Sequence, residues 1–372
     1  MVALFDPSGR ARWRRLVVHS GQTPKIGVLA GGLGVLVLGL AACASGASVQ
    51  GAGNGGGSSS SAPVPVTLAM DWTPNTNHSG IYVAQQLGYY RQAGIDLRII
   101  PNNGGFQAET LVSSHKADFG ISYSEGVALA QAAGGDIVSV FAILQKTDAV
   151  IGVRAGRTDI NSPKDLDGKI YAGFGAPYEV PLLKEVIRNA GGKGNVREIN
   201  LTTSAYQAVY AGRADYAMPE PTWEVIEAQL LGKPFKTFDL SKYGAAPTYG
   251  ALIASSRQFL AAHADVARRF LAATQRGYTY AAANPNDAAR ILIAANPGAF
   301  NNTRLVFLSA SLEAQQYYRD ASGRIGYQTL ARWTQDATFL YSVGALTDSA
   351  GHRLAHPPNF SGLFSNDYLP AP

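Results

Sequence analysis

Short apolar runs alternate with helical patterns from Pro65 onward. In the first part of this region, strands are predicted at 66–70, 97–100, 118–122 and 137–144. Apolar residues at helical spacing between these runs predict helices over 81–87, 106–114 and 126–133. This alternation of strand and helix predicts a mostly parallel sheet that is covered by helices.

The same alternation returns in the second half of the chain. Strands are predicted at 169–172, 196–201, 214–217 and 235–240, and helices over 180–187, 205–211 and 223–231. Further helices are predicted over 256–283, 288–295, 304–316 and 328–343. The sequence therefore predicts two α/β halves, followed by a largely helical part and a tail rich in proline and aromatic residues.

Two extended apolar segments, 149–153 and 247–254, flank the central part of the chain. We interpret them as crossovers, so that residues 154–246 form one lobe and residues 64–148 and 255–372 form the other. Two α/β lobes with parallel-rich sheets leave a cleft between the carboxyl ends of their strands, where such folds bind ligands. The expected fold class is α/β and bilobal, with the ligand cleft between the lobes.

The N-terminal part has the pattern of a secretion signal. A basic cluster at 10–15 precedes an uncharged stretch at 26–42, which is typical of a signal peptide. The stretch ends in Leu-Ala-Ala-Cys, which resembles the lipobox of bacterial lipoproteins. We therefore predict a signal peptide over 1–42, lipidation at Cys43, and a flexible Gly/Ser-rich tether over 43–63.

These features predict a protein that is held by lipid at the extracytoplasmic face of the cell membrane. The alternative is a plain signal-anchor helix with an incidental cysteine. Arg14-Arg15 also leaves a twin-arginine export route open beside the general one. The predicted export signal, lipid anchor and tether together favour a protein that captures or delivers a molecule at the cell surface over an enzyme of the cytoplasm.

Charge and composition narrow the function classes further. The formal net charge of +5 suggests a nucleic-acid partner, but without residues 1–42 the chain keeps 26 basic and 25 acidic residues. That near balance argues against nucleic acid. The single cysteine excludes an internal disulfide and a multi-cysteine metal site. No His-Glu-x-x-His, Gly-x-Ser-x-Gly or P-loop pattern occurs, so we expect no metal and no catalytic residues.

One long motif carries a family resemblance. Residues 70–84 read MDWTPNTNHSGIYVA, and this segment resembles the opening of the NMT1/THI5-like group of substrate-binding proteins. Segments that agree with the same group occur at 88–95, 118–123, 223–228 and 364–370. Within the group, the chain resembles the binding subunits of pyrimidine transporters that feed thiamine synthesis, over about residues 64–370.

The resemblance implies the type II periplasmic-binding-protein fold and a function in import. The protein would be a monomer without a cofactor that binds a small pyrimidine, such as formylaminopyrimidine or hydroxymethylpyrimidine. Closure of the cleft would present this ligand to an ABC permease. The same fold could instead bind riboflavin, a sulfonate or another heterocycle.

The candidate ligand-binding residues begin with Trp72, which follows a predicted strand and precedes a turn at Pro74. Its indole offers a stacking face to a flat heterocycle. Asn77 and His78 lie at the start of the first helix. There, Asn77 could simply cap the helix, and His78 could be a buried structural histidine rather than a ligand donor. Tyr178 is expected to face Trp72 from the other lobe.

A carboxylate should supply specificity for an aminopyrimidine by accepting paired N–H bonds. Glu179 is the first choice, although at the start of a helix it could merely complement the helix dipole. Glu220, between two prolines after a strand, is the second choice, and Glu125 and Glu224 compete for the role. Tyr123 and Trp223 complete the predicted set.

The rival hypothesis is an enzyme. Fungal relatives in the same superfamily are thiamine pyrimidine synthases that consume pyridoxal phosphate and one of their own histidines, with iron. The cysteine-rich iron motif of those synthases is absent here, and the segment 121–126, where they place a lysine and a histidine, reads ISYSEG. A Schiff base needs an amine at that place, so the sequence favours a binding protein.

Overall fold

The computed structural model describes residues 2–5, 11–14, 62–102, 107–147 and 149–371. The chain divides into two units, Met1–Ser58 and Ser59–Pro372. In the first unit, β1 (Val2–Phe5) and β2 (Ala11–Arg14) pair antiparallel. The rest of the predicted signal peptide, Cys43 and nearly all of the tether lie outside the described residues. Among the described residues, no helix has the length and apolar character that crossing a bilayer requires.

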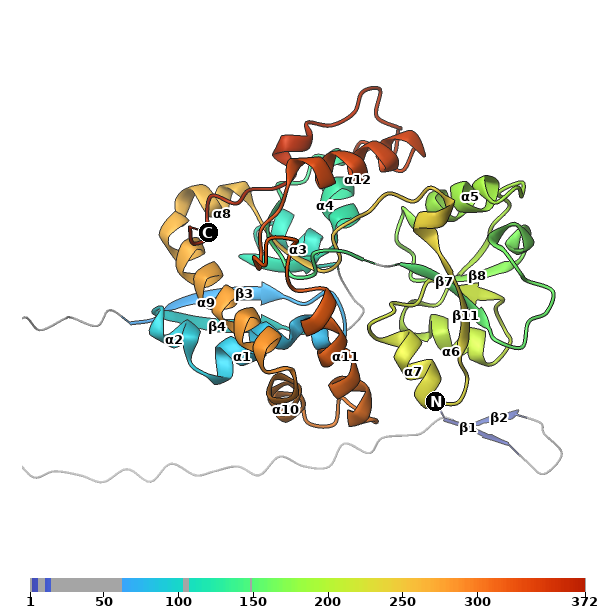
Figure 1. Ribbon diagram of the computed structural model, residues 1–372, viewed down its shortest axis with the longest axis horizontal. Helices are drawn as coiled ribbons and strands as arrows, with labels where there is room; N and C mark the ends of the chain where they lie inside the picture. The colour runs from blue at the N-terminus through green and yellow to red at the C-terminus, as the bar shows by residue number, and fades with distance from the viewer. Residues whose placement is uncertain (1, 6–10, 15–61, 103–106, 148, 372) are drawn as a thin grey trace, which may run out of the picture. The chain divides into compact units, whose positions relative to one another are not determined.

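Two five-stranded sheets organise the second unit (Figure 1). The first has the order β4-β3-β5-β12-β6 and the second the order β11-β7-β10-β8-β9. The strands of the first sheet are β3 (Val64–Ala69), β4 (Ile95–Ile100), β5 (Phe119–Ser122), β6 (Val138–Ala142) and β12 (Leu252–Ser255). Those of the second are β7 (Val150–Arg154), β8 (Ile170–Gly173), β9 (Arg197–Asn200), β10 (Tyr216–Ala217) and β11 (Phe235–Asp239).

Both sheets are mixed rather than parallel-rich. In the first sheet, β3 pairs in parallel with β4 and β5, whereas β12 runs antiparallel to β5 and β6. In the second, β8 pairs in parallel with β9 and β10, whereas β7 runs antiparallel to β10 and β11. The antiparallel strands β7 and β12 each follow a passage of the chain from one sheet to the other. The two passages therefore account for the mixed pattern.

Helices cover both sheets. The α-helices are α1 (Ser79–Gln86), α2 (Tyr89–Gln92), α3 (Ala108–Ser113), α4 (Ser124–Ala132), α5 (Glu179–Asn189), α6 (Ala205–Tyr210), α7 (Glu224–Leu230), α8 (Arg257–Ala262), α9 (Ala264–Ala283), α10 (Pro285–Ala295), α11 (Thr303–Gln316) and α12 (Leu330–Ser342). Short 3₁₀ helices are η1 (Thr76–His78), η2 (Pro163–Leu166), η3 (Thr202–Ser204), η4 (Leu240–Tyr243) and η5 (Phe360–Gly362).

The first sheet has an apolar core on each face, and together they make lobe 1. On one face, the core is shared by α1, α2, α9, α10 and α11, with α2 and α9 against β4 and with α10 and α11 packed on α1 and α9 (Figure 1). Helix α9 buries Phe270, Leu271, Thr274 and Tyr278 at helical spacing, which explains its length. On the other face, α3, α4 and α12 contribute to the second core.

Close packing of α1 on α9 depends on a glycine contact. A Cβ atom on Gly277 would lie 2.0 Å from the carbonyl oxygen of Gly80. Next to it, the Tyr278 hydroxyl donates a hydrogen bond of 2.6 Å to the carbonyl oxygen of Asn77. Helix α9 therefore holds the segment that connects β3 to α1, which is where the long sequence motif lies.

Lobe 2 is built in the same way around the second sheet. Helix α5 packs on one face through Leu183, Val186 and Ile187, and α6 packs on the other through residues such as Val209. The sheet ends at β9, whose four residues are all exposed and include charged side chains, as is usual for an edge strand. The bilobal α/β fold predicted from the sequence is confirmed.

The chain passes between the two sheets twice, between β6 and β7 and between β11 and β12. The predicted crossover at 149–153 coincides with β7, which is already paired in the sheet of lobe 2. The one at 247–254 leads into β12 of lobe 1. The lobe boundaries and hinges given above stay a prediction.

The predicted helix over 256–283 is two helices. Ser256 caps α8 by accepting from the backbone N–H of Phe259 at 3.0 Å, and α8 ends at Ala262. His263 has φ −133° and ψ 39°, outside the helical region, and α9 starts after it. The apolar spacing continues across the break, so the pattern alone did not reveal it.

Candidate functional site

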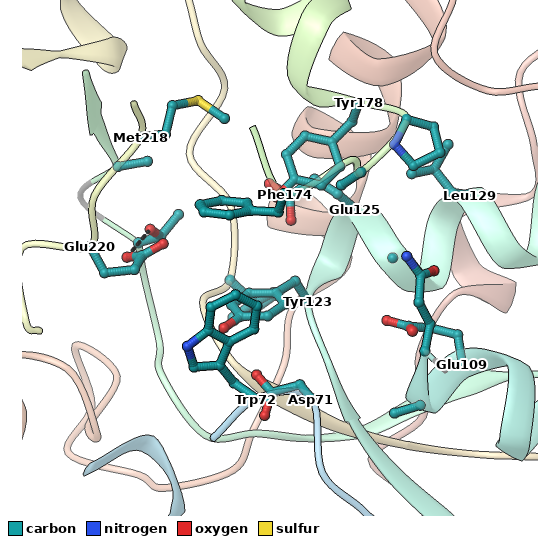
Figure 2. A pocket seen from close by; sticks show the side chains of 18 of the residues that line it. Asp71, Trp72, Glu109, Tyr123, Glu125, Leu129, Phe174, Tyr178, Met218 and Glu220 are labelled. Atoms are coloured by element: carbon teal, nitrogen blue, oxygen red, sulfur yellow. Dashed lines mark hydrogen bonds between the residues drawn. The ribbon is translucent and has the colours of Figure 1, made fainter. Parts of the chain in front are cut away.

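A cavity of about 690 Å³ is lined by residues of both lobes (Figure 2). Its walls come from segments that follow parallel strands: Trp72 after β3, Tyr123 after β5, Phe174 after β8 and Met218 after β10. Carboxyl ends of parallel strands are where open α/β sheets bind ligands. The volume is in the range of small-molecule sites.

Aromatic side chains form much of the wall. The ring of Trp72 meets the ring of Phe174 edge-on, with centroids 5.9 Å apart and planes at 73°. Tyr123, Tyr178 and Tyr206 also line the cavity. The sequence paired Trp72 with Tyr178, but the aromatic partner that contacts it from lobe 2 is Phe174.

Acidic groups dominate the polar part of the wall. Five carboxylates line the cavity, those of Asp71, Glu109, Glu125, Glu220 and Glu224. None of the described lining residues is Lys, Arg or His. The cavity therefore offers carboxyl oxygens as hydrogen-bond acceptors, and its described wall offers no cationic side chain to an anion.

Burial shifts the ionisation of several of these acids. It raises the pKa of Glu224 to about 8, and the nearby Glu220 carboxylate contributes to the rise. Burial also raises the pKa of Glu109 and of Glu125. Desolvation disfavours the charged form. A hydrogen-bond donor or a cation that enters the cavity would favour the ionised forms again.

The residues that follow β3 are fixed by a short network. Asn75 caps η1, since its side chain accepts from the backbone N–H of Asn77 at 2.9 Å. The Asn75 backbone N–H donates to Nδ1 of His78 at 3.3 Å. Because Nδ1 accepts, the ring proton lies on Nε2, which is 2.9 Å from Oδ1 of Asp71. His78 thus positions Asp71, and Asn75 takes the capping role suggested for Asn77.

Most of the predicted ligand-binding residues line this one cavity. They are Trp72, Asn77, Tyr123, Glu125, Tyr178, Glu220, Trp223 and Glu224. His78 and Glu179 do not line it, and both are fully buried.

Glu179 is occupied by its own loop. Its Oε2 accepts from the backbone N–H groups of Phe174, Gly175 and Ala176 at 3.0–3.2 Å. Its Oε1 accepts from the Tyr171 hydroxyl at 3.1 Å. In a phosphate-binding loop, such backbone amides donate to an anionic ligand. In this protein, they donate to the carboxylate of Glu179. Glu179 therefore shapes the loop that carries Phe174, rather than presenting a carboxylate to the cavity.

The sequence analysis missed many of the lining residues, among them Asp71, Glu109 and Phe174. Asp71 directly precedes Trp72, which was singled out, and Phe174 directly follows β8. No sequence signal points to Glu109; in the structure, a Cβ atom on Gly126 would lie 2.5 Å from Oε1 of Glu109. The glycine leaves room for the carboxylate between α3 and α4.

Comparison with known proteins agrees with the fold and the motif. The profile of the family described as NMT1/THI5 like matches residues 75–288. A formylaminopyrimidine-binding protein from Halalkalibacterium halodurans is 26% identical over 282 residues, which cover 73% of this chain and 83% of the relative. A 4-amino-5-hydroxymethyl-2-methylpyrimidine phosphate synthase from Legionella pneumophila is 24% identical over 237 residues, 62% of this chain and 73% of the relative.

Among solved structures, the alkanesulfonate-binding protein SsuA from Xanthomonas axonopodis pv. citri, bound to MOPS, superposes with a TM-score of 0.59 at 16% identity. The match covers 78% of this chain and 96% of that chain. The fold is thus that of the periplasmic binding proteins. The chain belongs to the NMT1/THI5-like family, whose profile spans more than half of it.

Proposed function

We propose that this protein is the extracytoplasmic binding component of an ABC importer and that it captures an aminopyrimidine precursor of thiamine. Formylaminopyrimidine and hydroxymethylpyrimidine are the two ligands that fit the proposal. The protein would bind the ring in the cavity between the lobes, and lobe closure would mark the loaded state for a permease. It acts as a monomer, without a cofactor and without a chemical step.

One observation carries this proposal: the cavity combines aromatic rings from both lobes with five carboxylates. An aminopyrimidine is flat and carries an exocyclic amine, so it can stack on a ring and donate N–H bonds to a carboxylate at once. Glu125, Glu220 and Glu224 are the predicted acceptors that line the cavity. The likeness to a formylaminopyrimidine-binding protein supports the same ligand class.

The cavity chemistry argues against the sulfonate alternative. A sulfonate is an anion, and the described wall has no Lys, Arg or His to neutralise it. Riboflavin is uncharged and remains the second candidate, because its flat ring system would also stack on Trp72.

The synthase alternative requires an amine for a Schiff base with pyridoxal phosphate. The described lining residues include no lysine. In addition, the segment after β5 supplies Tyr123 and Glu125 where those enzymes place a lysine and a histidine. A role in binding therefore fits the residues of this cavity better than a role in catalysis.

The Trp72→Ala variant tests the site. We expect the dissociation constant for formylaminopyrimidine to rise about tenfold to a hundredfold, because an aromatic pair contributes on the order of 1–3 kcal/mol including its buried area. Isothermal titration calorimetry of wild type and variant measures this. Tyr89→Ala, which removes a half-buried ring outside the cavity, is the control.

Unchanged affinity in Trp72→Ala would refute the stacking role. If the wild-type protein gives no heat with pyrimidines but does with riboflavin or with MOPS, the assigned ligand class is wrong. The competing ligands therefore belong in the same series of titrations.

Anchoring at Cys43 has its own test. A Gly/Ser tether alone has no membrane affinity, so Cys43→Ser should move the protein from the membrane pellet to the soluble fraction. Fractionation of cells followed by immunoblotting measures the shift. Cys43→Ala should behave in the same way, and equal retention of both variants and wild type in the pellet would refute lipid anchoring.

A further inference from the structure

Trp223 is an aromatic residue of lobe 2 that packs on lobe 1. It lies between β10 and β11 of the second sheet, directly before α7. Its half-buried ring packs against the apolar core that α1, α9, α10 and α11 share on one face of the first sheet. Helix α7 likewise contacts α11. Side-chain packing therefore joins the two lobes here, in addition to the two passages of the chain.

Phe300 contacts this ring from the side of lobe 1. The two rings meet edge-on, with centroids 6.2 Å apart and planes at 62°. Phe300 is half-buried in the loop between α10 and α11 and packs against the same core as Trp223. An edge-to-face pair is favourable beyond the apolar area that it buries. Separating the lobes would break this pair and expose more of both rings to water.

Each ring is carried by a segment that is tied to its own lobe. In lobe 2, the backbone N–H of Trp223 donates to the carbonyl oxygen of Glu220 at 3.1 Å and closes a turn before α7. In lobe 1, the Tyr82 hydroxyl of α1 donates to Oδ1 of Asn296 at 3.1 Å, where the loop that carries Phe300 begins. The contact between the rings therefore depends on the relative position of the lobes.

Phe300 differs from the other aromatic residues at which the lobes meet. Trp72, Phe174, Tyr178 and Trp223 all line the cavity, so each can touch a ligand directly. Phe300 does not line the cavity. An effect of Phe300 on ligand binding must therefore pass through Trp223 and the arrangement of the lobes.

We propose that Phe300 and Trp223 form a latch between the lobes, and that Phe300 raises the ligand affinity of the cavity without touching the ligand. The apparent affinity for a ligand falls with the fraction of the protein in the arrangement that binds it. The latch stabilises the arrangement in which Trp223 lines the cavity and packs on lobe 1. This inference rests on the proposed function, since it assigns to one residue the control of the lobe closure by which a small molecule is captured.

The Phe300→Ala variant removes the latch and leaves every residue of the cavity wall in place. We expect its dissociation constant for formylaminopyrimidine to rise about threefold to tenfold, the usual worth of an aromatic pair. Phe300→Tyr keeps the ring and should bind nearly as tightly as wild type. Tyr89→Ala removes a half-buried ring that packs on the same core outside the cavity, and it is the matched control. Isothermal titration calorimetry compares the four proteins.

A double-mutant cycle distinguishes a latch from a general structural role. In a Trp223→Leu background the ring that Phe300 contacts is already gone, so Phe300→Ala should change the dissociation constant by less than about twofold. Tyr89→Ala should have the same small effect in both backgrounds. Urea unfolding checks that Phe300→Ala is folded under the conditions of the titration. Phe300→Leu, which keeps an apolar side chain in the loop, takes its place if it is not.

The outcomes separate the latch from the proposed function. If folded Phe300→Ala binds formylaminopyrimidine as tightly as wild type, the latch is refuted while the pyrimidine function stands. An equal loss of affinity in the wild-type and Trp223→Leu backgrounds also refutes it. If wild type gives no heat with formylaminopyrimidine, the proposed function falls. The same variants are then titrated with riboflavin and with MOPS, because the latch depends on closure and not on which compound binds. If none of the three compounds binds, both proposals fall.

Discussion

The ligand-free protein should lose stability as the pH rises from 5 to 8, and Glu313→Gln should remove a large part of that loss. Glu313 on α11 is fully buried and accepts from the Thr76 and Tyr318 hydroxyls at 2.7 Å each. Burial raises the pKa of Glu313 from 4.5 to about 8, against the lowering effect of these two hydrogen bonds.

The sign follows from proton binding. Between these two pKa values the folded protein holds a proton on Glu313 that the unfolded chain has released, so a rising pH favours the unfolded state. One such group costs at most about 1.4 kcal/mol per pH unit, or roughly 3–4 kcal/mol from pH 5 to 8. Above about pH 8 the folded protein releases the proton as well, and this loss levels off.

Urea unfolding at several pH values measures the effect. The curve of unfolding free energy against pH should be flatter for Glu313→Gln than for wild type. Other buried acids, Glu224 among them, shift in the same direction and leave a residual slope. Glu185→Gln, at a half-buried position on the surface of α5, should leave the wild-type slope nearly unchanged. Parallel curves for Glu313→Gln and wild type would contradict the role of Glu313.

A second large effect is expected for Glu179→Ala. The substitution leaves three backbone N–H groups and the Tyr171 hydroxyl without the carboxylate that they now share. Losing such bonds in a buried place, together with the void left by the side chain, should lower the free energy of unfolding by about 2–4 kcal/mol. Differential scanning calorimetry and urea unfolding measure it.

Glu179→Gln is the matched control for Glu179→Ala. A glutamine oxygen can still accept from the amides of the loop, and its amide group can donate to the Tyr171 hydroxyl, so we expect a loss of only about 1 kcal/mol. Equal stability of Glu179→Ala and wild type would show that the loop is held by other contacts. Glu179→Ala should also weaken ligand binding, because the loop that Glu179 holds carries Phe174, whose ring contacts that of Trp72.

The sequence predicted the succession of strands and helices well because apolar spacing reports burial directly. The strand β6, for example, is buried at all five positions, and four of its five residues are apolar. It did not predict the break at His263, since the apolar stripe of α8 and α9 continues across it. Nor did it predict the mixed sheets, because the direction of β7 and β12 depends on how the chain returns between lobes.

The site was predicted in part, for a physical reason. Large aromatic residues after strands, such as Trp72 and Tyr123, fall in the cavity because strand ends meet there. Which hydrogen-bond donors a carboxylate accepts from depends on the conformation of the neighbouring loop. Residue types do not reveal that conformation. Glu179 and Glu125 both lie in the first turn of a helix that follows a strand. Three backbone amides of the loop before Glu179 donate to its carboxylate. Asp71 also lines the cavity, and its contact with His78 depends on how the segment after β3 folds, which the sequence pattern does not show.

The positions of the tryptophans allow ligand binding to be followed by the intrinsic fluorescence of the protein. Trp72 and Trp223 line the cavity, whereas Trp333 is fully buried in lobe 1 and its indole N–H donates to Gln328 at 3.1 Å. Trp13, the remaining one, precedes Cys43 and is absent from a chain that starts there. A molecule that stacks in the cavity should change the fluorescence emission of Trp72 and Trp223, while the emission of Trp333 stays constant. Unlabelled compounds can therefore be ranked by fluorescence alone, at protein concentrations far below those that calorimetry needs.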